Sequence, residues 1–117
     1  MNKADATLAQ WTTAKSREIS QEWPMGGMAE QDLIDTWRRR RPKMVARLER
    51  LGILREMAHV LWNLWAGAVR AYRKAGMGPT DAQEEAEKDW LLNEPETEDS
   101  PEVDPLDQIT TLPTPSN

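Results

Sequence analysis

The sequence predicts an all-α protein, a small irregular bundle of four to five short helices that ends in a disordered acidic tail. Apolar residues recur at helical spacing through most of the first 92 positions, and no stretch shows the period-two alternation of a strand. Proline and glycine divide this pattern into short elements. A chain of 117 residues has room for one small domain and not for two.

The first two predicted helices are separated by a linker. Residues 4–20 place three large apolar side chains near one face of a helix. A proline and two glycines between residues 23 and 27 then break the chain. A second helix is expected from about residue 29 to 40, where apolar residues recur at i, i+1 and i+4. Residues 1–28 are therefore assigned as an N-terminal helix and linker.

Pro42 and Gly52 set the limits of the third predicted helix. Proline disfavours the helical conformation of the residue before it but is well tolerated at the first helical position, so Pro42 ends one helix and opens the next. Gly52, followed by an apolar residue, is typical of a helix that ends with a left-handed glycine. The alternative is one continuous helix through Gly52, which would cost about 1 kcal/mol relative to alanine. We favour the break.

The fourth predicted helix, about residues 53–75, has the strictest apolar pattern in the chain. Its apolar arc covers most of the circumference around residues 60–65, so this helix must be central to the fold or shared with another chain. His59 falls on its narrow polar line and is interpreted as a surface histidine. A capping box at Thr80 predicts a fifth helix that runs to about residue 92. Residues 29–92 thus form the helical core domain.

The net charge of −5 is the difference between two unlike parts. Residues 1–80 hold 14 basic and 8 acidic side chains, whereas residues 81–117 hold 12 acidic ones and a single base, Lys88. Such asymmetry is typical of a surface that faces a polyanion, of a solubilising tail, or of both.

Residues 93–117 are predicted to be a disordered, acidic, proline-rich tail. They hold five of the eight prolines and few large apolar residues, so they cannot bury enough surface to offset their ordering entropy. An alternative is that Leu106, Ile109 and Leu112, spaced by three, form a short docking motif for the groove of a partner.

The order of motifs in the core domain resembles that of a known family. Arg41-Pro42 opens an apolar helix, Leu51-Gly52-Ile53-Leu54 forms a turn, and an acidic helix ends in Asp89-Trp90. Residues 41–92 are in this respect similar to the small TnpV-type accessory proteins of bacterial transposons and phage-like elements. Asp89 stands where the family has glutamate, and the first 40 residues do not join the comparison. The resemblance implies an accessory protein of a mobile element and supplies no catalytic residues.

The densest positive charge lies at the junction of the second and third helices. Lysine and arginine contacts to phosphates dominate nucleic-acid affinity, which makes this cluster a candidate phosphate or nucleic-acid contact. The candidate residues are Arg38, Arg39, Arg40, Arg41, Lys43, Arg47 and Arg50. The alternatives are a solvated basic cluster that complements the C-terminal dipole of the second helix, or a site for an acidic protein.

Tryptophan is the other unusual feature, since the chain has six Trp, one Tyr and no Phe. Most of the tryptophans fall among apolar neighbours, which favours roles in the core or as interface anchors. The residues predicted for a protein interface are Leu61, Trp62, Trp65, Val69 and Trp90.

Composition excludes several functional classes. The absence of cysteine rules out disulfides and thiolate metal sites, and a single histidine makes a zinc or haem centre unexpected. No apolar run approaches the roughly 20 residues that span a bilayer, and the N-terminus lacks the pattern of a signal peptide. No Ser-His-acid set or cofactor motif is apparent. We therefore expect a cytoplasmic, non-enzymatic protein without membrane contact, cofactor, metal or small-molecule substrate.

The function expected from the sequence is that of a small helical adaptor or accessory protein of a bacterial mobile element or phage, acting by protein–protein binding or self-association. The alternative is a nucleic-acid-binding protein that uses the basic cluster and is modulated by the acidic tail.

Overall fold

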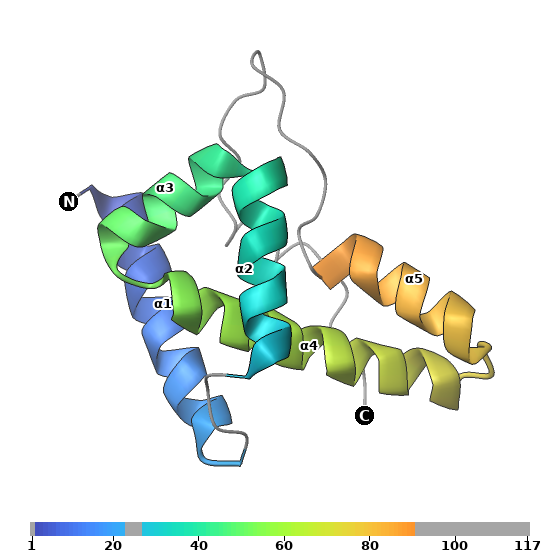
Figure 1. Cartoon of the computed structure of the whole chain (residues 1–117). Helices are drawn as coiled ribbons and strands as arrows, with labels where there is room; N and C mark the ends of the chain where they lie inside the picture. The colour runs from blue at the N-terminus through green and yellow to red at the C-terminus, as the bar shows by residue number, and fades with distance from the viewer. Residues whose placement is uncertain (1, 23–26, 91–117) are drawn as a thin grey trace.

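The computed structural model describes residues 2–22 and 27–90, and this part of the chain is all-α, as predicted (Figure 1). It contains five helices: α1 Lys3–Ser20, α2 Met28–Arg40, α3 Pro42–Leu51, α4 Leu54–Lys74 and α5 Pro79–Trp90. The predicted linker and the predicted acidic tail lie largely or wholly outside the described residues. No helix within the described ranges is both long and apolar enough to cross a membrane.

Local sequence signals explain where the first three helices begin and end. Asn2 caps α1, because its side-chain oxygen accepts a hydrogen bond from the backbone N–H of Asp5 at 2.7 Å. Arg41 leaves the helical region at φ −133° and ψ 60°, and Pro42 is the first residue of α3. The prediction that Pro42 separates two helices is therefore confirmed.

Glycine ends both α3 and α4 in the same way. Gly52 has φ 72° and Gly76 has φ 103°, which is the left-handed region. After Leu51, the N–H groups of Gly52 and Ile53 bond the carbonyls of Glu49 and Leu48, each at 3.0 Å. This pattern is a Schellman motif, so α3 and α4 are two helices, as the sequence predicted.

The fifth helix begins slightly earlier than its sequence signal indicated. Pro79 is its first residue, and the carbonyl of Gly78 accepts the first helical bond, from the N–H of Ala82 at 2.9 Å. Thr80 therefore lies inside the first turn and does not cap the helix. Proline at the first helical position, where no N–H is required, accounts for the difference.

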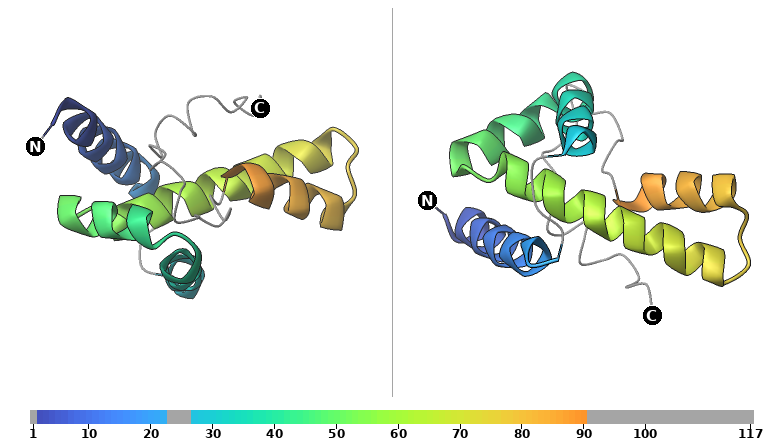
Figure 2. Two further views of the ribbon diagram at one scale, coloured as in Figure 1. Left: turned by 90° about the horizontal axis from the view of Figure 1, so that it is seen from above. Right: turned by 60° about the horizontal axis from the view of Figure 1, so that its bottom comes forward.

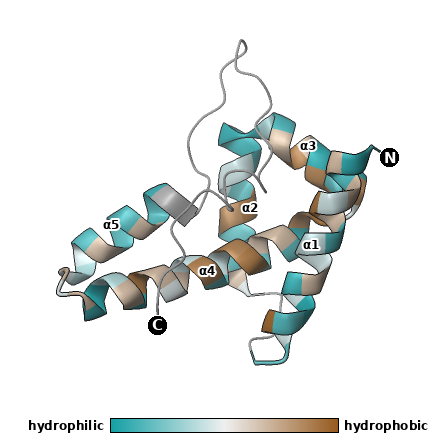
Figure 3. Ribbon diagram, turned by 180° about the vertical axis from the view of Figure 1, so that it is seen from behind, coloured by the Kyte–Doolittle hydropathy of each residue, from teal (hydrophilic) through white to brown (hydrophobic). Residues whose placement is uncertain are grey.

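Helix α4 is the central element. Its N-terminal half packs between α1 and the α2–α3 pair, which lie on opposite sides of it, while α5 folds back along its C-terminal half (Figure 2). The hydrophobic segments, drawn in brown, lie on α4 and on the helices that pack against it (Figure 3). Fully buried side chains come from all of the first four helices, among them Leu8, Trp37, Leu48, Met57 and Leu61. Helix α1 thus contributes to the same core as residues 29–92.

Candidate functional site

Most of the exposed residues of the predicted basic cluster lie where α2 meets α3. Arg39, Arg40 and Lys43 are exposed. Arg38 is half exposed, and its Nη1 donates to Glu49 Oε1 at 2.7 Å. Because α2 ends where α3 begins, these cations surround a single corner of the molecule, which we call the basic corner (Arg38, Arg39, Arg40 and Lys43).

Two arginines of the predicted cluster lie inside the molecule. Arg41 is 5% exposed and Arg47 is 8% exposed. The Nε of Arg47 donates to Asp5 Oδ1 at 2.8 Å, which joins α3 to the first turn of α1. Arg50 is exposed and approaches the same carboxylate, with its Nη2 at 3.6 Å from Asp5 Oδ2. No sequence signal indicates this pairing, because 42 positions separate Asp5 from Arg47.

The predicted protein-interface residues differ in their burial. Leu61 is fully buried in the core, whereas Trp62, Trp65 and Val69 are half-buried and pack at its edge. The rings of Trp62 and Trp65 are tilted by 34°, with centroids 4.7 Å apart. Within the described residues, the Nε1 of Trp65 is buried and has no hydrogen-bond acceptor. The side chain of Trp90 lies outside the described residues.

His59 is completely buried, so its interpretation as a surface histidine was wrong. At His59 the polar line of α4 is covered by the start of α2 and the end of α1, although Arg55 and Arg70 on the same line are exposed. Its Nδ1 lies 3.4 Å from Glu30 Oε2, and its Nε2 lies 3.3 Å from Ser20 Oγ. The side chain of Glu30 is also buried, whereas Ser20 is exposed. The structure thus assembles a Ser20–His59–Glu30 relay from three helices.

The surroundings of His59 define its neutral tautomer. A carboxylate oxygen can only accept a hydrogen bond, so Nδ1 carries the proton toward Glu30 and Nε2 is left to accept from the hydroxyl of Ser20. Asn63 Nδ2 lies 3.4 Å from Nδ1, but both atoms are donors in this tautomer. The Nδ2 group instead donates to the carbonyl of His59 at 2.7 Å.

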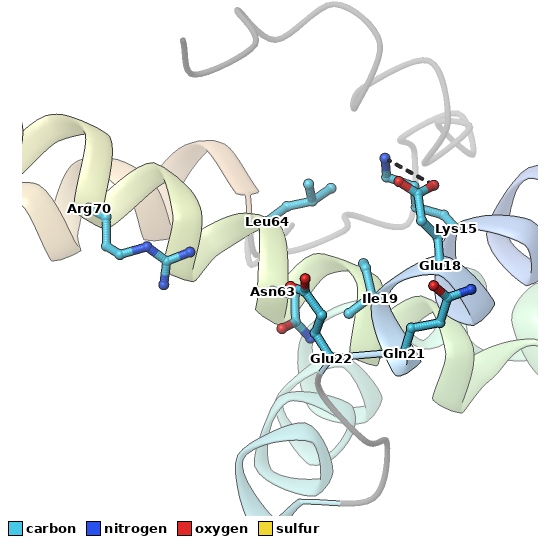
Figure 4. A pocket seen from close by; sticks show the side chains of 8 residues that line it. All are labelled: Lys15, Glu18, Ile19, Gln21, Glu22, Asn63, Leu64 and Arg70. Carbon is cyan, nitrogen blue, oxygen red and sulfur yellow. Dashed lines mark ion pairs between the residues drawn. The ribbon is translucent and has the colours of Figure 1, made fainter. Parts of the chain in front are cut away.

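A groove of about 400 Å³ runs between the last turns of α1 and the middle of α4 (Figure 4). Two apolar side chains, Ile19 and Leu64, line it together with charged and amide groups. Lys15 pairs with Glu18 at 3.8 Å on one side, and Arg70 extends from α4 on the other. The residues on either side of Ser20 belong to this lining, so the relay lies beside the groove.

No group of three or more histidine, aspartate or glutamate side chains in the described ranges is arranged to hold a metal ion. Comparison with known protein families, with curated proteins and with solved structures finds no match to this chain.

Proposed function

We propose that this protein is a small, non-enzymatic helical adaptor that acts by binding either a different protein or a second copy of itself. The observation that carries the proposal is the Trp62–Trp65 pair, which keeps part of its surface in water on the helix that organises the whole core. The TnpV-type resemblance adds a bacterial mobile element or phage as the setting, with the cytoplasm as the location.

The chemistry of this pair suits an interface. Tryptophan is enriched among the residues that dominate binding energies, because it offers a large rigid surface and one directional donor. The buried Nε1 of Trp65 has no acceptor among the described residues, and an unsatisfied buried donor costs about 1–3 kcal/mol. A partner that supplied a carbonyl after a small rearrangement of the ring would recover part of that free energy.

Light scattering on the full chain tests the proposal. We expect a mass above that of the 13.4 kDa monomer as concentration rises, and a return to the monomer in Trp62→Ser. The matched control is Trp11→Ser, which changes a half-buried tryptophan on α1. A monomer at every concentration, together with no protein cross-linked through a photoreactive residue at position 62 in a host cell, would contradict the proposal.

A second candidate function, nucleic-acid binding, is favoured by the exposure of the basic corner. Arg39, Arg40 and Lys43 are all exposed at adjoining helix ends, where phosphate groups can reach them. Arg41 and Arg47 are buried, so we expect them to stabilise the fold and not to contact nucleic acid.

Fluorescence anisotropy with labelled double-stranded DNA and single-stranded RNA tests this second function. Binding should weaken steeply with salt, and Arg39→Glu with Arg40→Glu should abolish it and flatten the salt dependence. The control, Arg73→Glu with Lys74→Glu, reverses two exposed cations at the far end of α4. Equal loss in both double variants would show that net charge alone, and not the basic corner, governs binding.

The acidic tail is proposed to compete for the basic corner. Replacing Glu94, Glu96 and Glu98 by glutamine in the full chain should strengthen nucleic-acid binding, most at low salt, where screening is weakest. Unchanged affinity at low salt would exclude competition by these carboxylates.

A further inference from the structure

We propose that Ser20 is an activated nucleophile that accepts an acyl group from an activated ester, with His59 as the proton acceptor and Glu30 as the residue that positions it. The inference goes beyond adaptor function, because neither protein binding nor nucleic-acid binding uses this buried relay. It rests on the juxtaposition of an exposed hydroxyl, a buried imidazole and a buried carboxylate.

The order of groups is the one that nucleophilic catalysis requires. A serine becomes reactive when its hydroxyl lies within reach of a base and the base is oriented by a third group. Here Ser20 Oγ lies 3.3 Å from His59 Nε2, and His59 Nδ1 lies 3.4 Å from Glu30 Oε2. These distances are somewhat long, as is common before a substrate is bound.

The burial of Glu30 and His59 supports a distinct role for each of them in the proposed reaction. The side chain of Glu30 is 8% exposed and that of His59 is 1% exposed, so water does not compete for the contact between them. Glu30 holds the proton on Nδ1 and thereby leaves the Nε2 lone pair directed at Ser20. When Nε2 takes up the serine proton, the resulting imidazolium lies beside the carboxylate, which stabilises it.

The proposed step balances without any further reactant. The Oγ of Ser20 attacks the carbonyl carbon of the ester, its proton passes to His59 Nε2, and the bond from that carbon to the leaving oxygen breaks. The leaving group departs as the alkoxide or phenolate and takes up a proton from His59 or from water. The product is an ester on Ser20, formed at the edge of the groove that Ile19, Gln21 and Asn63 help to line.

The location of Ser20 limits the rate of this reaction. Ser20 is the last residue of α1, and a helix C-terminus presents carbonyl oxygens and the negative end of its dipole. This end of the helix does not supply the N–H donors that stabilise a tetrahedral oxyanion. We therefore expect one slow acylation per chain and not rapid turnover, which is compatible with a non-enzymatic main function.

The test uses p-nitrophenyl acetate as the acyl donor and the full chain. We expect release of one p-nitrophenolate per chain and an acetyl group on the peptide that contains Ser20, detected by mass spectrometry. Ser20→Ala should lose both signals. The control Ser16→Ala, which removes a buried hydroxyl one turn earlier on α1, should retain them.

Two further variants separate activation from structural support. His59→Gln should slow acetylation about 100-fold, within the range for a positioned base. It should also change the pH dependence of the rate, because the variant has no imidazole to accept the serine proton. Glu30→Gln should slow the reaction, and Glu30→Asp should restore part of it.

Circular dichroism at the assay temperature confirms that each variant is folded. If a variant unfolds, the position of the acetyl group in the wild-type chain decides, because the proposal requires it on Ser20. Acetyl groups only on lysines, or an equal rate and pH profile in wild type and folded His59→Gln, would overturn the proposal.

Discussion

At the scale of single residues, Asp5 forms a buried ion pair with Arg47 and a more exposed one with Arg50, so the two pairs can be compared. Its bond to Arg47 is almost enclosed, with side-chain exposures of 11% and 9%, whereas Arg50 is 65% exposed and 3.6 Å away. Removing one partner of a buried pair leaves the other charge without compensation, which typically costs about 3–5 kcal/mol. An exposed pair contributes about 1 kcal/mol or less.

We therefore predict that Asp5→Asn lowers the free energy of unfolding by about 3 kcal/mol, while Arg50→Gln lowers it by less than about 1 kcal/mol. Urea denaturation of the full chain measures both values. The double variant Asp5→Leu with Arg47→Met should recover most of the loss, because an apolar pair needs no compensation. Equal losses in the two single variants would mean that the Asp5–Arg47 contact is not stabilising the fold.

Thr12 is a residue at which a substitution is expected to raise the stability of the fold instead of lowering it. It is fully buried in α1, and its Oγ1 has no hydrogen-bond partner among the described residues. Thr12→Val removes the unsatisfied hydroxyl at nearly constant volume, so stability should rise by about 1 kcal/mol. Thr7→Val changes an exposed position of the same helix and should leave the urea midpoint unchanged. A lower midpoint for Thr12→Val would indicate that the hydroxyl is hydrogen-bonded in solution.

The residues of the Ser20–His59–Glu30 relay could not be found from the sequence. Ser20 lies 39 positions from His59, and Glu30 lies 29 positions from it, so only the packing of α1, α2 and α4 brings them together. Helical periodicity placed His59 correctly on the polar line of α4. It could not show that other helices cover this line at His59, because periodicity defines the faces of a helix and not what covers them.

At the scale of elements, Gly52 before α4 and Gly67 inside α4 have opposite backbone requirements. Gly52 has φ 72°, where a side chain is strained, although a Cβ there would meet nothing within 4 Å. Gly67 lies within α4, where a Cβ would meet only Arg70 Nη2 at 3.9 Å.

The same substitution should therefore have opposite effects at these two positions. Gly52→Ala should destabilise by about 1–2 kcal/mol because alanine disfavours the left-handed region. Gly67→Ala should stabilise by up to about 1 kcal/mol because alanine is the better helix former. Thermal unfolding followed by circular dichroism compares them. Stabilisation by both substitutions would show that α3 and α4 merge into one helix in solution.

The helices themselves were predictable from local rules, since Pro42, Gly52 and Gly76 act on the backbone wherever the rest of the chain lies. The same local rules correctly limited α4 to within one residue at each end. They did not show which of the predicted interface residues of α4 are buried and which are partly exposed. Leu61 and Trp62 are adjacent in sequence, but one is fully buried and the other is half-buried, and only the position of α1 and α2 decides which.

At the scale of the whole molecule, the fold consists of a body, formed by helices α1 to α4, and an arm, formed by α5. The body buries large side chains between α4 and the helices α1, α2 and α3, whereas the described part of α5 buries only Ala82 and Ala86. The sequence predicted four to five helices but not this division, because the direction in which α5 folds back depends on the turn at Gly76 and on contacts with α4.

This division predicts that the molecule does not open as one unit. Local unfolding free energies depend on the apolar area that each element buries, and alanine buries much less than leucine or methionine. In native-state hydrogen exchange, the amides of α5 should therefore exchange through a low-energy opening, while those of Met57, Leu61 and their neighbours exchange only on global unfolding.

Ala86→Gly sharpens this test, because glycine in a helix interior costs about 1 kcal/mol relative to alanine. The substitution should lower the opening free energy of α5 by about that amount and leave the protection of the α4 amides near Met57 unchanged. The matched variant Ala58→Gly, at a fully buried position of α4 in the body, should instead lower the protection of every helix. If Ala86→Gly reduces protection equally in α4 and α5, the arm and the body form a single cooperative unit.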